Sequence, residues 1–355
     1  MTTQPVDFRS DNTASVAQPI MEAIVAANRG TAPSYGNDEM SKAVDRRLSD
    51  LFETEVRVFP VATGTAANAI ALSAMTRPWG GIYCHETAHI QTSECGAFEA
   101  QSGGAKLQLL PGAQYRITAD RLAKAISEAG VGQPHKPQPA GVSVTQATDF
   151  GTVYRLDELA AIGEVARANR LKMHMDGARF ANALDTLGCT PAEMTWKIGV
   201  DVLSFGATKN GCMSCDAIVA FDPAIAHELV FRLRRAGHVW SKMRFASAQL
   251  LAYVEDGLYL QLAARANALA RRMADGLSAL PGVKMHVAVE ANELFVEMPE
   301  AVITRLEAER FLFARRGPKL IRLVCRHDGT DAEVDQLIAA TRRLLPLASN
   351  VTALP

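Results

Sequence analysis

Apolar runs bounded by turn residues alternate with helical patterns through the first 245 residues of the chain. Segments such as Thr65–Met75 and Leu156–Asn169 have helical periodicity. This alternation predicts an α/β fold with a mostly parallel sheet that helices cover on both faces. Such sheets bind ligands at the carboxyl ends of their strands, so residues just after strands are the functional candidates. The runs that predict strands are Val56–Ala62, Gly81–Cys84, Lys106–Leu110, Gly141–Gln146, Leu171–Asp176, Val200–Phe205 and Ala217–Phe221.

The pattern changes near Phe245. A long stretch rich in Ala, Leu and Arg, Ala246–Leu280, predicts one helix that stops at Pro281-Gly282. Short strands and a closing helix are expected after it, at Val283–Val289, Glu293–Met298, Leu320–Cys325 and Asp331–Leu344. We therefore expect a large domain over residues 1–245 and a small α+β domain over residues 246–355.

Composition excludes several classes of protein. The 37 Lys and Arg residues balance 38 Asp and Glu residues, so no overall field attracts the chain to nucleic acid or to an anionic membrane. The chain has no run of 18 uncharged apolar residues, and its first ten residues lack the apolar run of a signal peptide. Six cysteines are too few for a disulfide scaffold. We expect a cytoplasmic globular protein.

Two charged residues follow or end predicted strands. Lys209 lies in Ser204–Gly211, directly after an apolar strand, where a lysine among glycines and apolar residues suits Schiff-base formation with a carbonyl. Asp176 ends the strand that begins at Leu171. A buried carboxylate needs a cationic partner, and the pyridinium nitrogen of pyridoxal phosphate is one. A surface lysine and a helix-capping aspartate are the alternative interpretations.

Two further features suit an anionic ligand. The segment Thr63–Asn68 joins a strand to a helix, and free N–H groups there form a phosphate cradle. Arg179 and Arg322 can each bind a carboxylate in a bidentate manner. Arg322 alternates with apolar residues, so it points away from them in the predicted strand.

Together these features resemble pyridoxal-phosphate enzymes of the aspartate-aminotransferase fold (fold type I), and more narrowly the L-threonine and phenylserine aldolases. The resemblance covers nearly the whole chain. It implies a large domain with a mostly parallel seven-stranded sheet and a small C-terminal α+β domain. The segments that carry the resemblance are Phe8–Asn12, Tyr35–Asp38, Thr63–Asn68, Ala88-His89, Glu94–Ala97, His174–Arg179 and Phe205–Gly211.

The resemblance implies roles for the residues that would bind the cofactor. Lys209 would hold pyridoxal 5'-phosphate as a Schiff base, and Asp176 would pair with its ring nitrogen. His89 would stack on the ring, and Gly64 and Thr65 would bind the phosphate.

The resemblance also implies substrate contacts and an oligomer. Ser10, Arg179 and Arg322 match positions that bind the substrate carboxylate, and Arg179 also borders the cofactor site. Tyr35 matches an active-site tyrosine. Arg234 matches a basic residue that reaches the phosphate of a neighbouring subunit, so a homodimer or homotetramer with its active site at the interface is expected.

The implied reaction is the cleavage of L-β-hydroxy-α-amino acids to glycine and an aldehyde. L-Threonine, L-allo-threonine and L-phenylserine are the candidate substrates. The base that takes the β-hydroxyl proton stays open between His89, Asp149 and a water. Many family members have a histidine in the segment where this chain has Asp149.

Two alternatives remain beside this interpretation. The same fold supports β-elimination at Cα, which the sequence does not separate from aldol cleavage. His85–His89 also matches H-E-x-x-H, the pattern of zinc peptidases. That pattern here follows a short strand directly and lacks the metzincin continuation, since Thr92 and Cys95 replace the required glycine and histidine. We therefore expect no metal site.

Overall fold

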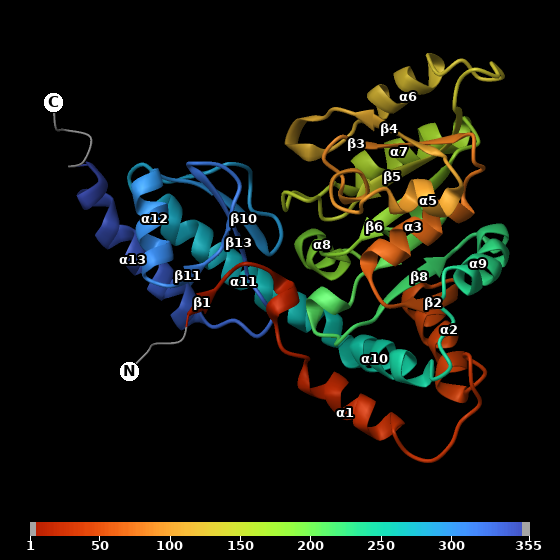
Figure 1. The fold of residues 1–355 in the computed structure, drawn as a ribbon, viewed down its shortest axis with the longest axis horizontal. Coiled ribbons are helices and arrows are strands. Elements are labelled where there is room, and N and C mark those ends of the chain that lie inside the picture. Colours follow the sequence, from red (N-terminus) through yellow and green to blue (C-terminus); the bar gives the residue numbers. More distant parts are fainter. Residues whose placement is uncertain (1–4, 350–355) are drawn as a thin grey trace.

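Seven strands form one sheet in the order β2-β8-β7-β6-β5-β3-β4 (Figure 1). Strand β8 runs antiparallel to both its neighbours, and the other pairs are parallel. All seven predicted strands and the predicted fold class are confirmed. In the computed structural model, which describes residues 5–349, the strands are β2 (Arg57–Val61), β3 (Gly80–His85), β4 (Lys106–Leu110), β5 (Gln138–Thr145), β6 (Lys172–Gly177), β7 (Val202–Phe205) and β8 (Asp216–Ala220).

Helices cover both faces of this sheet. Val202 and Leu203 are consecutive in β7 yet belong to different hydrophobic clusters, because strand side chains alternate between the faces. One face packs against α3 (Gly64–Ala74), α4 (His89–Thr92), α5 (Ala97–Ser102) and α9 (Pro223–Arg235). The other packs against α1 (Gln18–Ala27), α2 (Glu39–Phe52), α6 (Ala119–Ser127), α7 (Leu156–Ala168), α8 (Phe180–Leu187) and α10 (Arg244–Val254).

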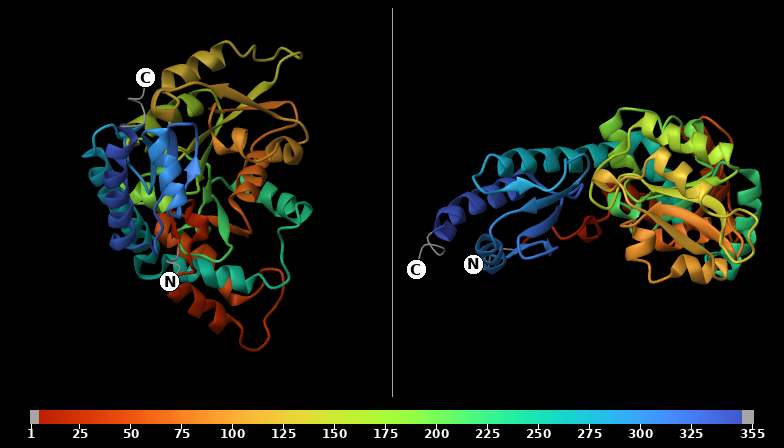
Figure 2. Two further views of the ribbon diagram at one scale, coloured as in Figure 1. Left: turned by 60° about the vertical axis from the view of Figure 1, so that its left-hand side comes forward. Right: turned by 90° about the horizontal axis from the view of Figure 1, so that it is seen from above.

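The C-terminal part forms a second lobe with its own core (Figures 1 and 2). Its antiparallel sheet has the order β12-β13-β10-β9. The N-terminal strand β1 (Val6–Asp7) belongs to this lobe, because it pairs with β11 (Phe311–Leu312). The other elements are β9 (Lys284–Met285), β10 (Glu293–Glu297), β12 (Ala314–Arg315), β13 (Leu320–Val324), α11 (Leu258–Ser278), α12 (Glu300–Ala308) and α13 (Asp331–Ser349).

The prediction of a single helix over Ala246–Leu280 is wrong. It is divided into α10 and α11, because Asp256 and Gly257 adopt φ values of 49° and 70° and interrupt the helical backbone. Leu250 of α10 packs in the core beside the large sheet, whereas Leu269 of α11 packs in the core of the second lobe. The domain boundary after residue 245 stays a prediction.

One edge of the large sheet gathers the candidate residues. The carboxyl ends of the parallel strands β2, β5, β6 and β7 meet there, together with the start of the antiparallel strand β8. The connections that leave this edge contain Thr63, Asp149, Arg179 and Lys209. Within residues 5–349, no helix has both the length and the apolar character needed to cross a membrane.

Candidate active site

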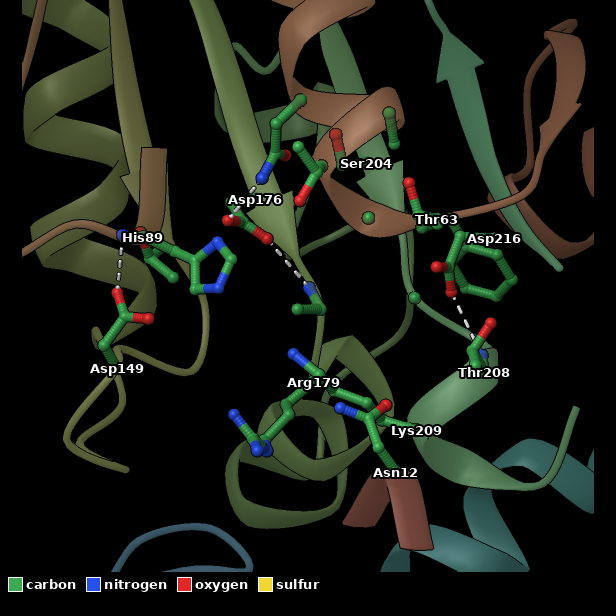
Figure 3. A pocket seen from close by; sticks show the side chains of 18 of the residues that line it. Asn12, Thr63, His89, Asp149, Asp176, Arg179, Ser204, Thr208, Lys209 and Asp216 are labelled. Carbon is green, nitrogen blue, oxygen red and sulfur yellow. Dashed lines mark hydrogen bonds between the residues drawn. The ribbon is translucent and has the colours of Figure 1, made fainter. Parts of the chain in front are cut away.

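A cavity of about 330 Å³ lies at the carboxyl edge of the large sheet (Figure 3). His89 and Asp149 lie on one side of it, and Thr63, Thr208 and Asp216 lie on the other. Most of the sequence-predicted site residues line this cavity, namely Gly64, Thr65, His89, Asp149, Asp176, Arg179 and Lys209.

The start of α3 forms the anion-binding end of the cavity. The Thr63 hydroxyl caps this helix by accepting a hydrogen bond from the N–H of Ala66 at 3.1 Å. The N–H groups of Gly64 and Thr65 precede that bond and remain free to bind a ligand within the described part of the chain. A Cβ on Gly64 would lie 3.9 Å from Oδ2 of Asp216, an ordinary van der Waals contact, so Asp216 borders the cradle on this side.

Asp216 is a buried carboxylate beside this cradle that sequence reasoning missed. Its Oδ1 accepts hydrogen bonds from the N–H groups of Ala207 (2.8 Å) and Thr208 (3.0 Å). These bonds fix the turn between β7 and Lys209. Burial raises the pKa of Asp216, although the two N–H groups oppose the rise.

Asp176 is buried at the end of β6, with 2% of its surface exposed. Its Oδ1 accepts the N–H of Ala178 at 3.0 Å, and its Oδ2 accepts Nδ2 of Asn68 at 2.8 Å. No cationic side chain lies within ion-pair distance of it among residues 5–349. A buried carboxylate with neutral protein partners is suited to a cationic ligand group.

His89 is oriented by a second buried acid. Its Nδ1 lies 2.8 Å from Oε1 of Glu94, which also accepts Nδ2 of Asn68 at 2.8 Å. The hydrogen bond to Glu94 raises the pKa of His89, with further support from the charges of Asp176 and Asp149. Glu94 therefore stabilises the protonated form of the imidazole.

Asp149 lies in the connection after β5, and its Oδ2 accepts the backbone N–H of His89 at 3.0 Å. Desolvation, together with repulsion from Asp176, raises the pKa of Asp149 to about 6. This carboxylate is ionised at neutral pH but is basic enough to accept a proton.

Lys209 lies in the short helical turn Thr208–Asn210 directly after β7. It lines the cavity, and its ammonium group has no hydrogen-bond or ion-pair partner within residues 5–349. A lysine without a partner, a carboxylate without a cation and free N–H groups at a helix start are three features that pyridoxal phosphate would satisfy together. The residues present therefore fit this cofactor.

The two predicted carboxylate-binding arginines lie close to each other, but buried acids already contact them. Arg179 donates to Asp11 through Nε (2.8 Å) and Nη2 (3.0 Å), and its Nη1 lies 2.8 Å from Oε2 of Glu293. Nη1 of Arg322 lies 3.5 Å from Oε1 of Glu293. Arg322 does not itself line the cavity.

Besides Arg322, three predicted site residues lie outside the cavity of this single chain, namely Ser10, Tyr35 and Arg234. Ser10 accepts the N–H of Asn12 at 3.1 Å and caps a short helical turn. Tyr35 is 50% exposed, and its ring centre lies 5.1 Å from the guanidinium carbon of Arg234. The structure thus pairs Tyr35 with Arg234 on the surface.

The H-E-x-x-H interpretation does not fit the structure. His85 ends strand β3 and His89 begins α4, so the two rings are not one turn apart on one helix. The ring nitrogens of His85 lie near the Thr87 hydroxyl (2.8 Å) and the Gly112 carbonyl (3.2 Å). No group of three or more metal-ligating side chains occurs in the part of the chain that the structure describes.

Sequence reasoning gave no role to several polar residues of the site. Asn68 and Glu94 lie in segments that carry the family resemblance, and that was the available signal for them. Asp11 lies in another such segment. Glu293 gave no signal, because an acid at the start of the alternating segment Glu293–Glu297 is typical of a solvated strand end.

The profile of the beta-eliminating lyase family matches residues 7–301. A low specificity L-threonine aldolase of Pseudomonas sp. (strain NCIMB 10558) is 39% identical over 97% of this chain and 99% of its own length. The corresponding protein of Pseudomonas aeruginosa is 40% identical over the same shares. A solved threonine aldolase structure from Leishmania major superposes with a TM-score of 0.90 at 25% identity, covering 96% of this chain and all of that one. The predicted relationship is confirmed, and the chain belongs to the beta-eliminating lyase family.

Proposed function

We propose that this protein is a pyridoxal-phosphate-dependent lyase that cleaves L-β-hydroxy-α-amino acids, L-threonine among them, to glycine and an aldehyde. The observation that carries the proposal is the placement of Asp176, a buried carboxylate without a cationic partner among the described residues, in the same cavity as the unpaired Lys209. The curated relatives named as L-threonine aldolases support the reaction class.

Five residues would hold the cofactor. Lys209 would bind it covalently through Nζ, and Asp176 would hold a proton on its ring nitrogen. His89 would cover one ring face, and the N–H groups of Gly64 and Thr65 would bind its phosphate. When bound, pyridoxal phosphate supplies an electron sink for the bonds at Cα of an amino acid.

Arg179 and Arg322 would bind the substrate carboxylate, with Ser10 as a further contact. Binding by two guanidinium groups fixes the rotation of the amino acid about its Cα. That rotation decides which Cα bond breaks. The two arginines therefore select the Cα–Cβ bond for cleavage.

Asp149 is the base that this geometry favours. Cleavage requires loss of the β-hydroxyl proton, and Asp149 lines the cavity as a carboxylate whose pKa is raised to about 6. His89 is the weaker candidate, because Glu94 stabilises its protonated form. In the reaction the hydroxyl proton goes to Asp149, the Cα–Cβ bond breaks, a carbonyl forms at Cβ, and Cα takes up a proton to give glycine.

Arg234 and Tyr35 support an oligomer. They lie together on the surface, outside the cavity of their own chain. In a homodimer or homotetramer they would complete the site of a neighbouring subunit, with Arg234 at the phosphate. A cytoplasmic location, expected from the sequence, stays a prediction.

The test supplies purified, cofactor-loaded protein with L-threonine, L-allo-threonine or L-phenylserine and measures aldehyde release. Aldehyde from at least one of them supports the proposal, and the ranking of kcat/KM gives the preferred side chain and β-epimer. A protein that binds pyridoxal phosphate yet releases no aldehyde from any of the three contradicts it.

A further inference from the structure

The carboxylate of Glu293 lies between the two arginines that the proposed function assigns to the substrate. Its Oε2 is 2.8 Å from Nη1 of Arg179, and its Oε1 is 3.5 Å from Nη1 of Arg322. The α-carboxylate of an amino acid would use the same chemical partners. We propose that Glu293 occupies the substrate-carboxylate position in the free enzyme and that the amino acid displaces it while Glu293 takes up one proton from solvent. This inference rests on the proposed function of the two arginines.

The hydrogen bonds distinguish Glu293 from the other acid of the cluster. Both carboxylate oxygens of Glu293 are buried and accept no well-aligned hydrogen bond within residues 5–349. Asp11 instead accepts two from Arg179 and one from Nδ2 of Asn292 at 3.0 Å. Nε of Arg322 is also buried without an acceptor. Asp11 is thus the fixed partner, and Glu293 and Arg322 keep bonding capacity for a ligand.

The charges of the cluster require a proton when a third carboxylate arrives. Arg179 and Arg322 balance Asp11 and Glu293, all four being mostly buried. The other charged groups that face Glu293 are Lys209 and Asp149. A substrate carboxylate would leave one excess buried negative charge, which is costly.

Glu293 is the acid best placed to accept that proton. Burial raises its pKa, and the attraction of Arg179 offsets this only in part. Burial also acts on Asp11, but the charges of Arg179 and Lys209 and its hydrogen bonds outweigh it, so the pKa of Asp11 is lowered. Protonated Glu293 would no longer compete for the arginines.

The local fold allows this exchange without unfolding. Glu293 opens β10 and pairs with Val324 of β13, whereas Arg322 pairs with Phe295. Glu293 and Arg322 are therefore diagonal neighbours on the same sheet face. Rotation of the Glu293 side chain would free the arginines while β10 and β13 stay paired.

The test compares the cofactor-loaded wild-type protein with Glu293→Gln, which mimics the protonated acid. Glycolate serves as the probe, because it has the substrate carboxylate without the amine. The constant for its inhibition of glycine binding is measured from pH 6 to 9. At pH values at which Glu293 is ionised in the free enzyme, the glycolate inhibition constant of the wild type should increase with pH. The increase should exceed that of Glu293→Gln by up to about tenfold per pH unit. The variant should also bind glycolate more tightly at high pH. Glu297→Gln, on the same strand, is the matched control and should behave as wild type.

Equal pH slopes in wild type and Glu293→Gln would overturn the proposal, as would loss of glycolate binding in the variant. If Glu293→Gln does not fold, Asp149→Asn supplies the decision. In Asp149→Asn the glycolate inhibition constant should depend on pH as it does in the wild type. If that pH dependence is lost, the proton is assigned to Asp149 instead. The binding readout is independent of turnover. If glycolate binding shows the predicted pH dependence but no aldehyde forms, only the proposed reaction is refuted. If aldehyde forms but the pH dependence is equal in wild type and Glu293→Gln, only the role of Glu293 is refuted.

Discussion

Nδ1 of His89 lies 2.8 Å from Oε1 of Glu94, and this same oxygen accepts a hydrogen bond from Asn68. The other amide hydrogen of Asn68 reaches Asp176. One asparagine thus connects the acid that would face the ring nitrogen with the acid that orients the ring-covering histidine. The residues that would contact the ring nitrogen and the ring face of the cofactor thus belong to one hydrogen-bonded network.

Glu94→Gln should lower the pKa of His89, because it removes the buried negative charge that stabilises the imidazolium. The raised pKa stabilises the fold fully below about pH 6.5, and this contribution is lost as pH rises through the folded pKa. NMR titration of the His89 ring measures the effect. Glu86→Gln, a neighbouring glutamate outside the network, is the control. An unchanged His89 titration would contradict the assignment.

Asp149→Asn should reduce kcat by about 10²–10⁴-fold, the usual contribution of a general base, while pyridoxal phosphate still binds. Wild-type kcat/KM should also fall below about pH 6, where Asp149 takes up a proton. The variant should lose this acid limb. The exposed Asp157→Asn is the matched control. Full activity in Asp149→Asn would transfer the role of base to His89 or to water.

Gly151→Ala should destabilise the protein and disturb the Asp149 loop. Gly151 has a φ of +76°, and a Cβ there would lie 2.9 Å from the carbonyl oxygen of Glu293. We expect a loss of about 1–3 kcal/mol in the free energy of unfolding, measured by urea denaturation. Gly132→Ala isolates the clash, because Gly132 has a φ of +80° with nothing within 4 Å. Equal losses in both variants would show that the contact with Glu293 contributes nothing.

Arg234→Ala should weaken pyridoxal-phosphate binding by about tenfold or more, the scale of one charge-assisted hydrogen bond. The adjacent Arg235→Ala should leave the affinity for pyridoxal phosphate unchanged. Cofactor affinity is followed by absorbance, and light scattering gives the oligomeric state. Undiminished affinity in an intact oligomer of Arg234→Ala would remove this residue from the neighbouring site.

The large sheet could be predicted from sequence because the strands β3, β6, β7 and β8 are buried on both faces and therefore are apolar runs between turn signals. The break between α10 and α11 was missed, since Asp256-Gly257 interrupts an otherwise continuous helical pattern. Strand β1 was missed as well. It has two residues, and its partner Phe311 lies some 300 positions away in the chain.

The cofactor residues were predictable because they follow strands or occur in segments with a family resemblance. One cavity is lined by Lys209, Asp176 and His89. Two buried acids beside the site were not predictable. Asp216 and Glu293 are acids at strand starts, and only the tertiary structure buries them beside Lys209 and Arg179.

The central claim is that Lys209 and its cavity support cleavage of the Cα–Cβ bond. The most direct measurement is the stoichiometry of products formed from L-threonine by the cofactor-loaded protein, with Lys209→Ala and the surface control Lys197→Ala beside it. The account predicts acetaldehyde and glycine in equal amounts from wild type and Lys197→Ala, and neither product nor yellow colour from Lys209→Ala. Formation of 2-oxobutanoate and ammonia without acetaldehyde, or full turnover by Lys209→Ala, would contradict it.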